Sequence, residues 1–170
     1  MVECSLWLKP AGKAYDNLAD LITNLSRKYS SPVFRPHVTL LDKLIGSEQD
    51  LLSRASALAA VVSPLRMHYA KIGYLDEYFK CLFIRVKKTH NLMQGHMRAR
   101  EIFEWQSEAE YMPHLSLVYG NLPSMTKKEI VSDLRRNLRP IGFDVKTVQL
   151  VVTEGQPKEW TLMKELRLKG

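Results

Sequence analysis

One short pattern of chemically active residues occurs twice in this sequence. The copies span residues 34–41 (FRPHVTLL) and 111–118 (YMPHLSLV). Both read aromatic residue, any residue, Pro, His, aliphatic residue, hydroxyl residue, Leu, aliphatic residue. A pair of imidazoles can supply a neutral base and a charged acid near pH 7, and hydroxyl groups can donate hydrogen bonds to a negatively charged group. The pattern therefore predicts acid–base catalysis on an anionic substrate.

Each copy is predicted to form a short strand with one catalytic face. Proline fixes its own φ and keeps the preceding residue out of the helical region, so the chain enters each copy in an extended conformation. Side chains alternate between the two faces of a strand, which places the imidazole and the hydroxyl of one copy on the same face. A single His-x-Thr has little meaning, but a second copy in the other half of the chain indicates two units that converge on one cleft. The candidate catalytic residues are His37, Thr39, His114 and Ser116.

These two copies resemble the motifs of the two-histidine (2H) phosphoesterase superfamily, and within it those of the cyclic phosphodiesterases of plants and fungi. Residues 5–10 (SLWLKP), residues 78–83 (YFKCLF) and Trp160 support the resemblance, which spans nearly the whole chain. It implies an α+β, bilobal 2H phosphoesterase fold. In that fold, two antiparallel sheets line a central cleft, helices lie outside, and each lobe carries one motif.

The resemblance also implies an activity. Enzymes of this kind are metal-independent and open nucleoside 2′,3′-cyclic phosphates to 2′-phosphates, and plant and yeast members open ADP-ribose 1″,2″-cyclic phosphate, a by-product of tRNA splicing, to the 1″-phosphate. We expect His114 to act as the base towards water and His37 as the acid, although the symmetry of the motifs does not decide between them. Tyr119 lies where the resembling enzymes place an aromatic residue beside the substrate, and packing within the strand is the equal alternative.

Two other functions remain open at this point. The first is a non-catalytic nucleotide- or RNA-binding module on the same fold, and the second is an enzyme that processes RNA ends, related to 2′-5′ RNA ligase. The intact histidine and hydroxyl positions favour catalysis. Because the chain lacks a long insertion rich in basic and aromatic residues, a small substrate is favoured over RNA.

Composition is that of one globular domain. The chain has 170 residues, of which 45% are hydrophobic and 25% charged, and its net charge is +7. We expect a single domain over residues 1–170, with two pseudo-symmetric lobes, that acts as a monomer. A positive field favours anionic partners such as nucleotides or RNA ends, but the basic residues are spread along the chain.

Cysteine and histidine spacing gives no sign of a metal site or cofactor. Cys4 and Cys81 lie in apolar runs typical of buried free thiols, and no known ligand spacing surrounds the remaining histidines. No signal peptide and no membrane-spanning stretch is evident. The expected location is the cytoplasm, or the cytoplasm together with the nucleus.

Helices and strands are expected to alternate along the chain, with the motif strands among them. Arg85 is the one charged residue of an otherwise apolar stretch, which indicates a position at a cleft or an edge. Phe34 and Tyr111 are expected in the core. Thr126 and Glu129 read as a capping box, with Met125 stapled onto Ile130 and Pro140 ending that helix. Helices are expected at residues 11–29, 47–62, 89–103 and 126–138, and strands at 2–8, 36–42, 65–74, 79–86, at the second motif up to 120, and at 142–153 and 159–168.

Overall fold

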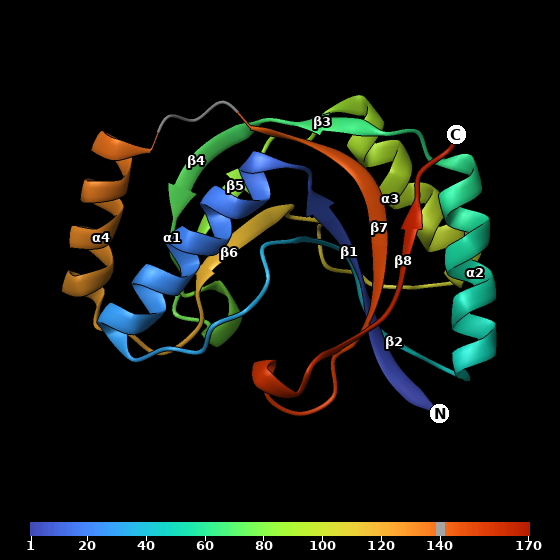
Figure 1. Ribbon diagram of the computed structural model, residues 1–170, viewed down its shortest axis with the longest axis horizontal. Coiled ribbons are helices and arrows are strands. Elements are labelled where there is room, and N and C mark those ends of the chain that lie inside the picture. Colours follow the sequence, from blue (N-terminus) through green and yellow to red (C-terminus); the bar gives the residue numbers. More distant parts are fainter. Residues whose placement is uncertain (139–141) are drawn as a thin grey trace.

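The computed structural model describes residues 1–138 and 142–170 (Figure 1). Eight strands, four α-helices and two short 3-10 helices follow one another along these residues. Their order is β1 (Val2–Pro10), α1 (Lys13–Tyr29), β2 (Val38–Gly46), α2 (Glu48–Val61), β3 (Leu65–Met67), β4 (Tyr69–Gly73), η1 (Tyr78–Lys80), β5 (Leu82–Val86), α3 (His90–Phe103), β6 (His114–Val118), α4 (Ser124–Asn137), β7 (Phe143–Val152), η2 (Pro157–Glu159) and β8 (Thr161–Arg167).

All the strand pairs are antiparallel, and the strands follow the order β3-β7-β1-β2-β6-β5-β4, with β8 added beside β7. The sheet has two halves. One contains β1, β2, β3, β7 and β8, and the other contains β4, β5 and β6. In the register of the described strands, the pair Val38–Leu115 joins the two halves. The expected α+β fold with two antiparallel lobes is confirmed, and the structure adds that the lobes are continuous at the two motif strands.

The two outermost strands of this path, β3 and β4, are consecutive in the chain and are separated only by His68. The sheet therefore curves round until it is nearly closed, as Figure 1 shows. One long strand was expected at residues 65–74. The break at His68 lets the first part pair with β7 in one lobe and the second part with β5 in the other.

The helices cover the outside of the sheet. Helices α2 and α3 pack on each other and on β2, β3, β7 and β8, α1 contacts β1 and β6, and α4 contacts β4 (Figure 1). The apolar face of the strands packs beneath them, and Leu6, Val38, Leu115 and Leu150 are fully buried there. This leaves the other face of the two motif strands available for chemistry.

The observed starts of α2 and α4 show where local sequence signals predicted a helix start correctly and where they did not. Ser47 caps α2 as expected, since its hydroxyl accepts a hydrogen bond from the amide of Asp50. The capping box at Thr126 and Glu129 was wrong, because α4 begins two residues earlier, after Pro123, and has no side-chain cap. Proline suits a helix entry because its φ is fixed near the helical value. The expected staple is also wrong, since Met125 is 66% exposed.

Tertiary contacts explain two further differences. Lys127 is 3% exposed and donates to the carbonyl of Leu75 and to Asp76, so α4 is anchored to the loop before η1. The 3-10 helix η1 includes residues 79 and 80, which were expected at the start of a strand, and β5 consequently begins at Leu82. The predicted stop at Pro140 lies outside the described residues. Both cysteines, Cys4 and Cys81, are buried and free, as expected.

Candidate active site

The register between the motif strands places the four candidate residues in one group. Val38 pairs with Leu115 in an antiparallel ladder. Continued by one residue on each side, this register sets His37 opposite Ser116 and Thr39 opposite His114. Since Val38 and Leu115 are fully buried, their neighbours project from the other face of the sheet.

The four side chains therefore stand at the corners of a quadrilateral in which imidazoles and hydroxyls alternate. A pseudo-two-fold axis through the Val38–Leu115 pair relates the two copies of the motif. The two histidines lie on a diagonal, for which the backbone separation in a sheet is about 7–8 Å. A tetrahedral phosphate ester can lie between two rings at such a spacing, with one imidazole on each side of phosphorus.

A matched hydrogen bond orients each imidazole. The Nδ1 of His37 lies 2.6 Å from the carbonyl oxygen of Arg35, and the Nδ1 of His114 lies 2.8 Å from that of Met112. A carbonyl oxygen can only accept, so Nδ1 carries the hydrogen in both rings. Each neutral ring then keeps its lone pair on Nε2, and that nitrogen is left to react with a substrate or water.

Burial makes both rings harder to protonate. The pKa of His37 is lowered to about 4, mainly by burial and in smaller part by the charge of His114, while the hydrogen bond to the Arg35 carbonyl acts in the opposite direction. Burial also lowers the pKa of His114, which the Met112 carbonyl opposes and the Lys80 charge reinforces. Both imidazoles are therefore neutral at pH 7 in the free protein. An anion placed between them would raise the pKa of both and allow one ring to hold a proton.

Trp7 lies flat against His37. The two ring centroids are 3.6 Å apart and the planes are within 7° of parallel. Trp7 comes from β1, where it pairs with Thr39, and it is 3% exposed. The indole face fixes the imidazole plane and would favour its protonated form by a cation–π interaction.

His114 has different neighbours. The edge of Phe83 faces it with centroids 5.4 Å apart, and Arg85 is its direct cross-strand partner. The sequence indicated that Arg85 lies at a cleft or an edge, and the structure places it beside this histidine. No aromatic ring stacks flat on His114 among the contacts of the described residues.

The two hydroxyl residues differ in the free protein. Ser116 is 6% exposed, and its Oγ donates a 2.8 Å hydrogen bond to the carbonyl of Phe79. It must rotate away from that carbonyl to donate to a substrate. Thr39 is partly exposed, and its backbone carbonyl accepts a hydrogen bond from the hydroxyl of Tyr111, which crosses from the other lobe. Tyr111 thus helps to hold the β2 motif in place.

Tyr119 belongs to an aromatic cluster beside Ser116. Its ring stacks on Phe34 with centroids 3.7 Å apart, and the edges of Phe79 and Trp160 lie at 5.2 and 6.0 Å. Burial raises its pKa, and a hydrogen bond with Ser116 opposes this. At 3% exposure, the ring is a packing residue of the free protein, and contact with a substrate stays a prediction.

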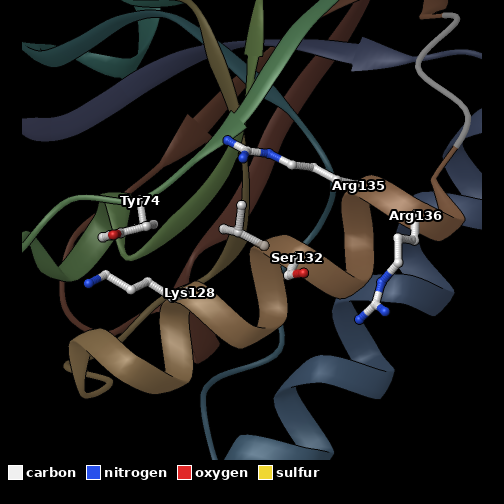
Figure 2. A pocket seen from close by; sticks show the side chains of 6 residues that line it. Tyr74, Lys128, Ser132, Arg135 and Arg136 are labelled. Atoms are coloured by element: carbon white, nitrogen blue, oxygen red, sulfur yellow. The ribbon is translucent and has the colours of Figure 1, made fainter.

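Two hollows mark the surface. One, of about 320 Å³, includes Trp7 in its lining, together with further aromatic and basic side chains, among them Tyr15, Phe34, Arg35, Lys158 and Trp160. The other, of about 480 Å³, lies between α4 and the end of β4 and is lined by Tyr74, Lys128, Val131, Ser132, Arg135 and Arg136 (Figure 2). It contains no motif residue. Arg135 donates to the Ile72 carbonyl and Arg136 to Asp133, so two of its three cations are already engaged.

Metal-binding and membrane-spanning features are both absent from the residues outside 139–141. Among these residues, no three side chains of His, Cys, Asp or Glu lie close enough to hold a metal ion. No described helix is both long and apolar enough to cross a membrane.

Comparison with known proteins agrees with this geometry. The family described as "Cyclic phosphodiesterase-like protein" matches residues 1–168. The chain belongs to this family. It is thus an enzyme of the cyclic phosphodiesterase type.

Individual members of the cyclic phosphodiesterase family show how far the likeness extends. The "Cyclic phosphodiesterase" of Arabidopsis thaliana is 22% identical over 91% of this chain and 87% of its own length. A "2′,3′-cyclic-nucleotide 3′-phosphodiesterase" of Phaeosphaeria nodorum is 30% identical over 71% of this chain and 70% of its own. The fold matches that of E. coli LigT complexed with 3′-AMP, with a TM-score of 0.64, 13% identity and 99% of each chain covered.

Sequence reasoning missed several residues of this site. It gave no particular role to the Arg35 and Met112 carbonyls, and it did not predict that Trp7 stacks on His37. The carbonyl contacts are local, since each spans two residues across a proline, and the repeated Pro-His pair was the available signal. The Trp7 contact depends on which strand lies beside β2, for which the sequence offered no signal.

Proposed function

We propose that this enzyme hydrolyses nucleoside 2′,3′-cyclic phosphates to 2′-phosphates without a metal ion, by acid–base catalysis at His37 and His114. The observation that supports it best is the diagonal pair of imidazoles, each with Nδ1 bound to a backbone carbonyl and Nε2 left to react. The names of the relatives and the nucleotide bound by LigT agree with a nucleotide substrate.

In the proposed reaction, Nε2 of His114 takes a proton from water as the water oxygen bonds to phosphorus. The bond between phosphorus and the 3′ oxygen breaks, and Nε2 of His37 gives its proton to that leaving oxygen. The product carries a 2′-phosphate and a free 3′-hydroxyl. Thr39 and Ser116 donate hydrogen bonds to the non-bridging oxygens, where negative charge accumulates in the transition state.

The surroundings of the two rings support His37 as the acid and His114 as the base. Burial opposes the protonation of His37, with a pKa of about 4, so the acid form requires the substrate's negative charge beside it. The face of Trp7 then stabilises the imidazolium. Among the charges near His114, Lys80 and Arg85 favour the neutral, basic ring and Glu77 opposes them.

The same chemistry applies to ADP-ribose 1″,2″-cyclic phosphate, which carries the same five-membered cyclic ester on adjacent ribose oxygens. We propose that it is hydrolysed to the 1″-phosphate by the same four residues. The enzyme can accept both substrates if the part of each molecule beyond this ribose lies outside the space between the four catalytic residues.

The test is product identification with matched variants. The protein is incubated with 2′,3′-cyclic AMP and with ADP-ribose 1″,2″-cyclic phosphate in the presence of EDTA, and the phosphate isomers are separated. We expect 2′-AMP and the 1″-phosphate from the unaltered protein, strong losses in His37→Ala and His114→Ala, and unchanged rates in His90→Ala. His90 is an exposed histidine at the start of α3, outside the cleft. Binding without turnover of either compound would instead support the nucleotide-binding alternative.

A further inference from the structure

Three side chains form a row across the lobe that carries the second motif. Arg85 of β5 is the cross-strand partner of His114 on β6, and Lys71 of β4 is the partner of Arg85. Directly paired residues project from the same face of a sheet. With neighbouring strands about 4.8 Å apart, the backbones of Arg85 and Lys71 are about 5 and 10 Å from that of His114.

Other residues confirm which face this is. Phe83 lies two positions before Arg85 on β5, pairs with Ser116, and presents its edge to the His114 ring. Ile72, which alternates with Lys71 on β4, is buried on the helix-covered face. Arg85 is partly exposed and Lys71 is exposed, so both cations are available to a molecule that binds beside His114 on this face of the sheet.

No carboxylate among the described residues forms an ion pair with Lys71 or Arg85 of this row. Glu110, whose charge interacts with that of Arg85, forms its ion pair with Lys88. Glu77, whose charge acts on His114, forms its ion pair with Lys80. Like charges directly opposite each other destabilise a sheet. Such a pair beside a reactive imidazole is stabilised when an anion lies across it.

This face of the sheet is therefore polarised along β6. At the end of this strand beyond Ser116, Phe79, Tyr119 and Trp160 form the aromatic cluster described above. At the His114 end, β5 and β4 present the two cations. A substrate with its reacting phosphate between the histidines would find aromatic rings on one side and positive charge on the other.

We propose that Lys71 and Arg85 form a second anion subsite, which holds a phosphate on the 5′ oxygen of the ribose that carries the cyclic phosphate. This inference rests on the proposed function of His37 and His114 and narrows its substrate class. An RNA 3′ end and ADP-ribose 1″,2″-cyclic phosphate both have a phosphate at that oxygen, whereas a cyclic mononucleoside phosphate has a hydroxyl. The arginine fork can bind two phosphate oxygens at once, and the lysine adds a point charge.

The experiment compares kcat/KM for 2′,3′-cyclic AMP with and without a 5′-phosphate. We expect the unaltered protein to prefer the 5′-phosphorylated compound about tenfold or more, the usual effect of a hydrogen bond to a charged group. Arg85→Gln and Lys71→Gln should each reduce this ratio, and the double variant should bring it near one. Using a ratio removes any effect of Arg85 on the histidine itself. Arg98→Gln on α3 has the same change in charge as Arg85→Gln, far from the cleft, and should keep the ratio.

Two further arms separate the sources of the phosphate. A dinucleotide that ends in a 2′,3′-cyclic phosphate represents RNA, and ADP-ribose 1″,2″-cyclic phosphate represents the pyrophosphate compound. A preference that depends on Arg85 in either arm supports the subsite and identifies its substrate. Turnover of 2′,3′-cyclic AMP with no gain from a 5′-phosphate, or a gain that survives in the double variant, overturns the subsite and leaves the proposed function intact. Absence of turnover for every compound would refute the proposed function itself.

Discussion

Replacing His37 by Asn should make the fold less sensitive to acid. Burial holds the pKa of His37 near 4, below its ordinary value of about 6.5, so the folded protein resists a proton that the unfolded chain accepts. The direction follows from linkage. Stability is complete above pH 6.5 and is lost as the pH falls from 6.5 towards 4, because protons there bind the unfolded state preferentially.

The size of the loss follows from the two pKa values. Between pH 7 and pH 4.5, a shift from 6.5 to about 4 lowers the free energy of unfolding by about 2 kcal/mol through this one side chain. Asparagine has no such titration, is of similar size, and its side-chain amide can still donate to the Arg35 carbonyl. The variant should therefore lose about 2 kcal/mol less than the unaltered protein over the same interval.

Urea unfolding followed by circular dichroism at pH 7 and pH 4.5 measures this difference, and His90→Asn serves as the exposed control. Comparing the pH-dependent change, rather than stability at one pH, removes any packing defect that Asn introduces against Trp7. If His37→Asn and the unaltered protein lost equal stability between the two pH values, burial would not be what keeps this imidazole neutral, and the reasoning above would be refuted.

Three kinetic predictions follow from the same site. His37→Ala and His114→Ala should each lower kcat about 10²- to 10⁴-fold, and the double variant should lose far less than the product of the two, which steady-state assays on a cyclic nucleotide will measure. Thr39→Ala and Ser116→Ala should lower kcat about 100-fold with smaller changes in urea unfolding, and a variant that unfolds but keeps its specific activity would place that hydroxyl in a structural role. Turnover should survive excess EDTA, and activity restored to an EDTA-treated protein only by a divalent ion would exclude this mechanism. The pH profile of kcat/KM should be bell-shaped with its optimum at or below about 6.5, because burial lowers the pKa of both histidines.

Local patterns in the sequence were sufficient to predict the motif strands and the face on which their polar residues lie. Alternation of side chains along a strand needs no knowledge of the rest of the fold. Thus the placement of His37 with Thr39 on one face, and of His114 with Ser116, could be predicted from the sequence alone. The helix cap at Ser47 was predictable for the same reason, since it depends on residues within one turn.

Features that depend on contacts between distant segments could not be predicted in this way. Alternation does not say which strand lies beside another or in which register, so Trp7 could not be assigned to His37, nor Arg85 to His114. The start of α4 was wrong for a related reason. The buried lysine at position 127 ties that helix to the loop at 75–76, and this distant anchor outweighed the local capping signal at Thr126.

The duplication itself gives two geometrically equivalent histidines, but hydrolysis of an ester needs an acid and a base. The axis through Val38 and Leu115 relates the two rings, and even their carbonyl hydrogen bonds match. The surrounding strands differ: β1 presents an indole face to His37, whereas β5 presents a guanidinium beside His114. An indole face stabilises an imidazolium and a neighbouring cation destabilises one. In the proposed mechanism, the lobes around the repeated motif, rather than the motif residues, therefore distinguish the acid from the base.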